Sequence, residues 1–280
     1  MTENPLVSTE WLAEHLNAPD LVVLDASMYL PNAGRDANAE YLAEHIPGAV
    51  RFDIDDVSDP NSDLPHTLPA PHVFSSKMRK LGVGDGQTVV VYDSAGFYAA
   101  PRAWWMFKVM GAEQVFILNG GLPKWKAEGR PVEDGIVTRP ERHFTARLNH
   151  GAVADLSDVK QMVQDKSRQI LDARPAARFK AEVPEPRAGL RGGHMPGAFN
   201  TPSTGFTAED GTFLAPEELK KVFVDAGVDL EKPVTTSCGS GVTAAVITLA
   251  LTLVGHKDHT LYDGSWTEWG GRDDTEVVTG

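Results

Sequence analysis

The chain has 280 residues, of which 41% are hydrophobic and 23% are charged, which suffices for one large core or two of medium size. Its formal net charge of −13 opposes tight binding to nucleic acid or to an anionic membrane, because both need clustered positive charge on the protein. We therefore expect no nucleic-acid partner and no membrane partner. An anionic substrate would have to be attracted by a local group of arginines.

The N-terminal residues contain no cationic segment followed by an apolar run, so we expect no secretory signal and a cytoplasmic location. The longest apolar stretch, 242–254, is shorter than the roughly 18 residues of a membrane span and is typical of a buried core helix. Cys238 is the only cysteine, which excludes an internal disulfide, a cysteine-rich zinc site and an internal thiol pair. Any sulfur chemistry must therefore end on a partner molecule.

Sequence elements of the first half recur in the second half. Leu-Asp-Ala at 24–26 recurs at 171–173, and His-Ile-Pro-Gly-Ala at 45–49 recurs as His-Met-Pro-Gly-Ala at 194–198. The order is preserved, and the offsets are 147 and 149 residues. A repeat of this length is a whole domain rather than a solenoid unit, so the chain is predicted to be a duplicated domain.

In chain order, each half is predicted to contain a short apolar strand, a helix, a second strand, another helix and a third strand, which indicates a parallel α/β fold. The first-half elements are the strand 21–24, the helix 71–82 between a proline and a glycine, and the central strand 88–92. Their second-half counterparts are the strand 170–171, the helix 216–227 and the central strand 233–237.

These elements predict two tandem α/β domains, each a parallel sheet flanked by helices. We assign the first domain to residues 1–136 and the second to residues 158–280. The segment 137–157 has weak periodicity and several polar and glycine residues, so it is predicted to be the interdomain linker.

The two halves differ after the central strand. In the second half that strand runs into Cys238, a small-residue loop and a long apolar helix, whereas the first half has Asp93 at the matching position. Glycines let a loop curl around a ligand, and loop amides with a helix N-terminus stabilise a thiolate. A buried, inert thiol is the alternative, but the carboxyl end of a parallel strand is where α/β folds bind ligands. Cys238 is therefore the candidate nucleophile.

The duplicated unit, the paired His-x-Pro-Gly-Ala motifs and Cys-Gly-Ser-Gly-Val-Thr at 238–243 resemble the rhodanese superfamily, specifically its 3-mercaptopyruvate sulfurtransferases. The resemblance covers nearly the whole chain. It implies two rhodanese-like domains and a persulfide on Cys238, formed from 3-mercaptopyruvate with release of pyruvate. The sulfur would then pass to a thiol such as thioredoxin or a small thiol, or to cyanide, with no cofactor and no metal.

The local arginines that an anionic substrate needs are present between the first strand of the second half and His194, and arginine suits planar carboxylates through paired hydrogen bonds. The resemblance implies that Arg178 and Arg187 bind the carboxylate and carbonyl of mercaptopyruvate. For Arg174 and Arg191 we favour a solvated loop balanced by nearby carboxylates, those of Glu182 and Glu185.

The same resemblance implies a set of residues that move protons, with Ser240 in the loop and His66 and Asp55 from the first half. Without the resemblance, His66 would be interpreted as an exposed histidine in a proline-bounded loop. The remaining loop residues are expected to bind the substrate and the persulfide through their amides: Gly239, Gly241, Val242 and Thr243.

Two other repeated residue types are interpreted as structural. His45 and His194 occur in both halves, including the half without a nucleophile, and so do Trp125 and Trp269. None of the nine histidines lies in a spacing that suggests zinc.

The sequence leaves four alternative functions. A phosphatase of related architecture would need an arginine where Ala244 stands. A dinucleotide site would use Gly-x-Gly-x-x-Ala at 239–244, but that fingerprint normally follows the first strand of its unit. Thiosulfate-using relatives carry basic side chains just after the cysteine, where this chain has Gly239 and Ser240. A non-catalytic binding module usually lacks the cysteine altogether.

Overall fold

The computed structural model describes residues 4–30 and 32–280 and divides the chain into two compact units. The N-terminal unit is formed by Met1–Pro60, Leu68–Leu148 and Thr207–Phe213. The C-terminal unit is formed by Asn61–Thr67, Asn149–Phe206 and Leu214–Gly280. Each unit thus includes a short segment from the other half of the sequence.

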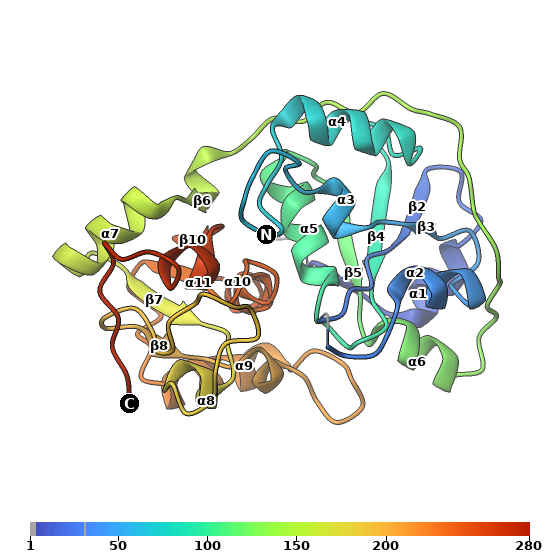
Figure 1. The fold of residues 1–280 in the computed structure, drawn as a ribbon. Helices are drawn as coiled ribbons and strands as arrows, with labels where there is room; N and C mark the ends of the chain where they lie inside the picture. Colours follow the sequence, from blue (N-terminus) through green and yellow to red (C-terminus); the bar gives the residue numbers. More distant parts are fainter. Residues whose placement is uncertain (1–3, 31) are drawn as a thin grey trace. The chain divides into compact units, whose positions relative to one another are not determined.

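The N-terminal unit contains a five-stranded sheet in the order β1-β5-β4-β2-β3, in which all described pairings are parallel (Figure 1). Its strands are β1 (Leu6–Val7), β2 (Leu21–Asp25), β3 (Val50–Arg51), β4 (Thr88–Tyr92) and β5 (Val115–Leu118). Its helices are α1 (Thr9–His15), α2 (Ala37–Ala43), α3 (Ile54–Val57), α4 (Pro71–Lys80), α5 (Ala100–Val109) and α6 (Gly121–Ala127).

The C-terminal unit repeats this arrangement in a second parallel sheet, in the order β6-β10-β9-β7-β8 (Figure 1). Its strands are β6 (Val153–Ala154), β7 (Gln169–Asp172), β8 (Phe199–Asn200), β9 (Val234–Ser237) and β10 (His259–Tyr262). Its helices are η1 (His150–Ala152), α7 (Leu156–Asp165), α8 (Ala176–Phe179), η2 (Ser203–Phe206), α9 (Pro216–Asp225), α10 (Ala244–Leu253) and α11 (Ser265–Trp269). The predicted fold class, two parallel α/β domains, is confirmed.

The strands are apolar because both faces of each sheet are covered. All five residues of β2 are buried, as expected for a strand inside a parallel sheet. Leu21 and Val23 pack in one core cluster with Leu12 of α1 and Trp125 of α6. The apolar stretch after Cys238 forms α10, whose first eight residues are all buried, so it is a core helix as predicted.

The sheets have more strands than the sequence pattern predicted. The additional strands β1, β3, β6 and β8 are two residues long, too short to give a period-two signal. β6 lies within the range predicted as a linker, 137–157, and so does the boundary between the two units at Leu148 and Asn149. Among the described residues, no helix is long and apolar enough to cross a membrane.

The repeated histidines make equivalent contacts in the two units. His45 Nδ1 lies 2.7 Å from the Tyr41 carbonyl oxygen, and its ring stacks on the Tyr41 ring. His194 Nδ1 lies 2.9 Å from the Phe179 carbonyl oxygen, and its ring stacks on the Phe179 ring. Both side chains therefore fix a turn in the fold.

The repeated tryptophans are also equivalent. Trp125 and Trp269 are buried, and each indole N–H donates to a backbone carbonyl 2.7 Å away, that of Pro131 or Glu276. Their contacts are packing contacts.

Candidate functional site

Cys238 directly follows β9, the central strand of the C-terminal sheet, and is buried. Its backbone N–H donates to Ser265 Oγ (3.2 Å), and its carbonyl accepts from the Trp266 N–H (3.0 Å). The next carbonyl, that of Gly239, accepts from the Thr267 N–H (2.8 Å). The first residues of α11 thus hold the backbone of the cysteine in place.

The loop after Cys238 is compact and mostly buried. Ser240 and Val242 are buried, and Gly241 has φ +80°, a left-handed conformation that favours glycine. Thr243 is half-buried and directly precedes α10. Loop amides and the N-terminus of a ten-residue helix therefore lie close to Cys238 in the chain, an arrangement suited to an anionic sulfur.

Arg178, in α8, reaches this loop. A Cβ atom placed on Gly239 would lie only 3.1 Å from Arg178 Nη2, so the glycine leaves space for the guanidinium. The Arg178 side chain pairs with Glu185, with 2.5 Å between Nη2 and Oε2. A positive charge is therefore fixed beside the loop that carries the nucleophile.

Arg174 supports this arrangement from the interior of the unit. Its guanidinium donates to both carboxylate oxygens of Asp172, to Glu185 Oε1 at 2.9 Å and to the Gly193 carbonyl at 2.7 Å, and it lies over the Trp266 ring. Burial lowers the pKa of Arg174, but the two carboxylates outweigh burial and raise it overall. The prediction of a solvated loop residue is wrong for Arg174, whose side chain is 1% exposed.

Arg187 differs from the other arginines of this region. It is half-buried in the loop after α8 and has no hydrogen-bond or ion-pair partner among the residues that the structure describes. It lines an open cavity of about 580 Å³ together with Glu185. Its charge is thus available to a ligand.

Arg191 is also not a solvated residue balanced by glutamates. Its guanidinium donates to the backbone carbonyls of Trp269, Gly270 and Thr275, at 2.9 to 3.1 Å. It holds the segment after α11 in place, and the carboxylate of Glu185 is taken by Arg174 and Arg178 instead.

His66 lies in the segment Asn61–Thr67, which belongs to the C-terminal unit. Its side chain is buried, and its Nδ1 atom is 2.9 Å from Ser240 Oγ. The structure thus brings together two of the three residues predicted to move protons. Asp55, the third, lies in the first turn of α3 in the N-terminal unit, and its role stays a prediction.

The N-terminal unit has a carboxylate where the nucleophile would be. The buried carboxylate of Asp93 accepts the backbone N–H groups of Ala95 (3.0 Å), Ala99 (2.8 Å) and Ala100 (2.7 Å). Burial raises the pKa of Asp93, although these amides act in the opposite direction. This loop therefore binds its own carboxyl side chain and offers no nucleophile.

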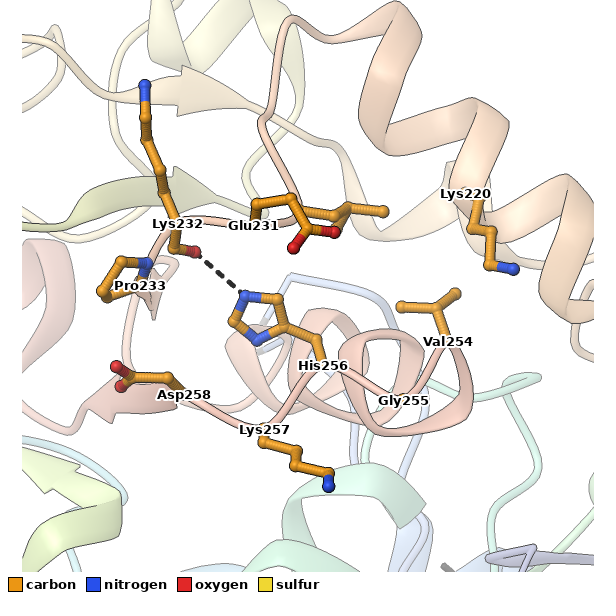
Figure 2. A pocket seen from close by; sticks show the side chains of 10 residues that line it. Lys220, Glu231, Lys232, Pro233, Val254, Gly255, His256, Lys257 and Asp258 are labelled. Carbon is orange, nitrogen blue, oxygen red and sulfur yellow. Dashed lines mark hydrogen bonds between the residues drawn. The ribbon is translucent and has the colours of Figure 1, made fainter.

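A second cavity of the C-terminal unit, of about 590 Å³, lies at the amino end of β9 (Figure 2). His256 Nε2 lies 3.0 Å from the Lys232 carbonyl oxygen there. β9 separates this cavity from Cys238 by four residues, about 13 Å along a strand. We therefore assign it no part in chemistry at Cys238.

His259, three residues after His256, predicts that the stability of the protein depends on pH. Burial, and to a smaller extent the neighbouring His256, lower the pKa of His259 from 6.5 to about 4. As the pH falls below 6.5 the unfolded chain binds a proton at this histidine before the folded protein does, so stability is lost between pH 6.5 and 4. At pH 5 this histidine alone should lower the free energy of unfolding by about 2 kcal/mol relative to pH 7.5.

Urea denaturation at both pH values tests this prediction. His259→Gln should reduce the difference between the two pH values by that amount, whereas His72→Gln, at an exposed position of α4, should leave it unchanged. An unchanged difference in His259→Gln would show that this histidine is not the acid-sensitive group.

Sequence reasoning missed Ser265 and Glu185. Ser265 occupies the repeat position of Gly121, and both have left-handed backbone, φ +49° and +56°. This conformation is strained for serine, and the hydroxyl binds the Cys238 amide, so a serine in place of the repeated glycine was the available signal. For Glu185 the sequence predicts a solvated charge, whereas the structure shows a buried side chain paired with two arginines. Among the described residues, no group of three or more histidine, cysteine, aspartate or glutamate side chains is placed to hold a metal ion.

Comparison with known proteins connects this geometry to a family. The model of the rhodanese-like domain matches residues 8–128 and 155–272. The chain is 47% identical to 3-mercaptopyruvate sulfurtransferase of Escherichia coli (strain K12), over 99% of both chains. It is 43% identical to thiosulfate sulfurtransferase of Rattus norvegicus, over 94% of this chain and 91% of that protein.

A solved structure shows the same similarity. The crystal structure of SseA from Escherichia coli, described as a 3-mercaptopyruvate sulfotransferase, superposes with a TM-score of 0.87 at 46% identity. The superposition covers 94% of this chain and 99% of the other.

Proposed function

We propose that this chain, which belongs to the rhodanese-like family, is a 3-mercaptopyruvate sulfurtransferase. The observation that carries the proposal is the buried Cys238 at the carboxyl end of β9, with the Arg178 guanidinium beside the next residue. A nucleophilic thiolate and a fixed cation are the two groups that transfer of sulfur from an anionic donor needs.

In the proposed reaction, the Cys238 thiolate attacks the thiol sulfur of 3-mercaptopyruvate. A sulfur–sulfur bond forms and the carbon–sulfur bond breaks, and its electron pair leaves with the carbon as pyruvate enolate. Arg178 binds the donor carboxylate, and Arg187, which has no hydrogen-bond or ion-pair partner among the described residues, binds the carbonyl and stabilises the enolate charge. Protonation of the enolate carbon gives pyruvate, and Cys238 is left as a persulfide held by the amides of 239–243.

Ser240 and His66 are proposed to move the protons of this reaction. Their 2.9 Å contact allows a proton to pass between the hydroxyl and the imidazole, and Asp55 is proposed to act with them. General acid–base catalysis typically contributes about 10² to 10⁴ in rate. His66→Gln should therefore lower kcat by about 10² in steady-state kinetics; an unchanged kcat would remove His66 from the relay.

The proposed donor follows from the residues after Cys238. The rat thiosulfate sulfurtransferase is nearly as similar to this chain as the E. coli enzyme is, so overall identity is a weak guide to the donor. A side chain at position 239 would crowd Arg178, and a basic one would also place like charges together. With Gly239 and Ser240 here, thiosulfate should be the poorer donor.

The proposed acceptor is an external thiol, such as thioredoxin or a small thiol, or cyanide. Cys238 is the only cysteine of the chain, so no second thiol can attack the persulfide. A thiol acceptor suits a reducing compartment, and we propose a cytoplasmic location on that ground.

The test is to incubate the reduced protein with 3-mercaptopyruvate or with thiosulfate, and to measure pyruvate release and the intact mass. We expect pyruvate and one added sulfur atom per chain from 3-mercaptopyruvate, and little added sulfur from thiosulfate. The reverse preference would support a thiosulfate sulfurtransferase. No added sulfur from either donor would favour a non-catalytic binding module.

A further inference from the structure

Glu185 is a buried carboxylate shared by two arginines. Its side chain is 1% exposed, although the residue lies in the irregular loop after α8. Oε1 accepts from Arg174 Nη1 at 2.9 Å and from Arg178 Nε at 3.3 Å, and Oε2 accepts from Arg178 Nη2 at 2.5 Å. A carboxylate this deeply buried in a loop needs such partners, because burial of an unpaired charge is strongly unfavourable.

These contacts use one particular edge of the Arg178 guanidinium. A guanidinium has five N–H groups, and two of its edges can bind an oxygen pair. Glu185 occupies the Nε–Nη2 edge, so the Nη1–Nη2 edge is left for another ligand. In the described structure, all side-chain hydrogen bonds of Arg178 go to Glu185. The orientation of its free edge therefore depends on Glu185.

The position of Glu185 is itself fixed from the interior. Arg174 holds Glu185 Oε1 and binds both oxygens of Asp172, which directly ends β7. The guanidinium of Arg174 also lies over the ring of Trp266, and the backbone N–H of Trp266 donates to the Cys238 carbonyl. One set of contacts thus connects the backbone of the nucleophile to the side chain of Arg178.

We infer that Glu185 is a positioning residue that turns the free edge of Arg178 toward the donor carboxylate. This inference rests on the proposed function and adds a residue to it. Glu185 makes no bond to the donor and takes no part in proton transfer. Its loss should weaken donor binding while leaving the reaction at Cys238 intact.

Steady-state kinetics of Glu185→Gln with 3-mercaptopyruvate test the inference. The amide has nearly the same shape, and Arg174 keeps its bonds to Asp172, so the variant should fold; thermal denaturation checks this. We expect KM to rise about tenfold, equivalent to about 1.4 kcal/mol of binding, with kcat within about twofold of the parent. A purely structural role would instead lower the active fraction, and with it kcat, at unchanged KM.

The matched control is Glu182→Gln, which removes the same charge from an exposed position of the same loop. This control variant should leave KM unchanged. A rise in KM equal to that of Glu185→Gln would mean that loss of a negative charge anywhere in the loop weakens donor binding, and it would overturn the inference.

A double-mutant cycle with Arg178→Ala decides whether Glu185 acts through Arg178. In the Arg178→Ala background, Glu185→Gln should have no further effect on KM. A full tenfold effect in that background would overturn the inference. The parent protein is assayed first. If it releases no pyruvate from 3-mercaptopyruvate, the proposed function itself fails, independently of any result with the variants.

Discussion

Replacing Cys238 with serine should reduce pyruvate release from 3-mercaptopyruvate to the rate of the uncatalysed reaction and should remove the added sulfur atom from the intact mass. A serine hydroxyl stays protonated in surroundings that can stabilise a thiolate, and an oxygen in this place cannot form a persulfide. No other cysteine is present to substitute for Cys238. The effect on activity should be the largest of any single substitution in the chain.

The fold should survive this change, because the hydroxyl is smaller than the thiol and the backbone bonds to Ser265 and Trp266 do not involve the sulfur. The control is the urea denaturation midpoint, which should match that of the parent protein. Pyruvate release by a correctly folded Cys238→Ser protein would contradict the mechanism.

The elements that the sequence predicted well are those with strong local signals. β4 was predicted as 88–92 and is observed as Thr88–Tyr92, because a run of β-branched residues buried on both faces has few alternatives. α9 begins at Pro216, as the proline at its first turn indicated. The two-residue strands were missed because their pairing is decided by the neighbouring strand and not by their own residues.

The nucleophile was predictable for a different reason. Comparing the two halves showed Cys238 where the other half has Asp93, and the structure shows why both residue types fit one loop. Asp93 fills its loop with a carboxylate bound by three backbone amides. A loop whose backbone amides point at a side-chain oxygen in one half is suited to bind an anionic sulfur in the other.

The partners of the arginines could not be predicted from spacing. Glu182 and Glu185 are three residues apart in the same loop, yet only the second is buried and paired. Which glutamate turns inward depends on where Arg174 and Arg178 lie, and Arg174 packs on the ring of Trp266, which comes from a distant part of the C-terminal unit. The segment Asn61–Thr67 likewise belongs to the C-terminal unit without any local sequence signal. This segment carries His66, whose ring contacts the Ser240 hydroxyl.

Arg174→Met should lower the free energy of unfolding by about 3 to 5 kcal/mol, since it removes the cation between two buried carboxylates. Asp172 and Glu185 each have a side chain only 1% exposed, so neither could be rehydrated without disrupting the packing around Trp266. Urea denaturation measures the loss. A loss below about 1 kcal/mol would mean that the carboxylates do not depend on Arg174 for their burial.

The compensating variant separates the charge of this cluster from its shape. Adding Asp172→Asn and Glu185→Met to Arg174→Met removes all three buried charges. The side-chain oxygen of the asparagine introduced at position 172 can still accept the backbone N–H of residue 174, and replacing buried ion pairs with apolar groups of similar volume is often close to neutral for stability. Most of the lost stability should return. KM for 3-mercaptopyruvate should nevertheless stay raised, because the carboxylate that orients Arg178 is absent. Recovery of stability without recovery of donor binding would show that the charges of this cluster serve the site rather than the fold.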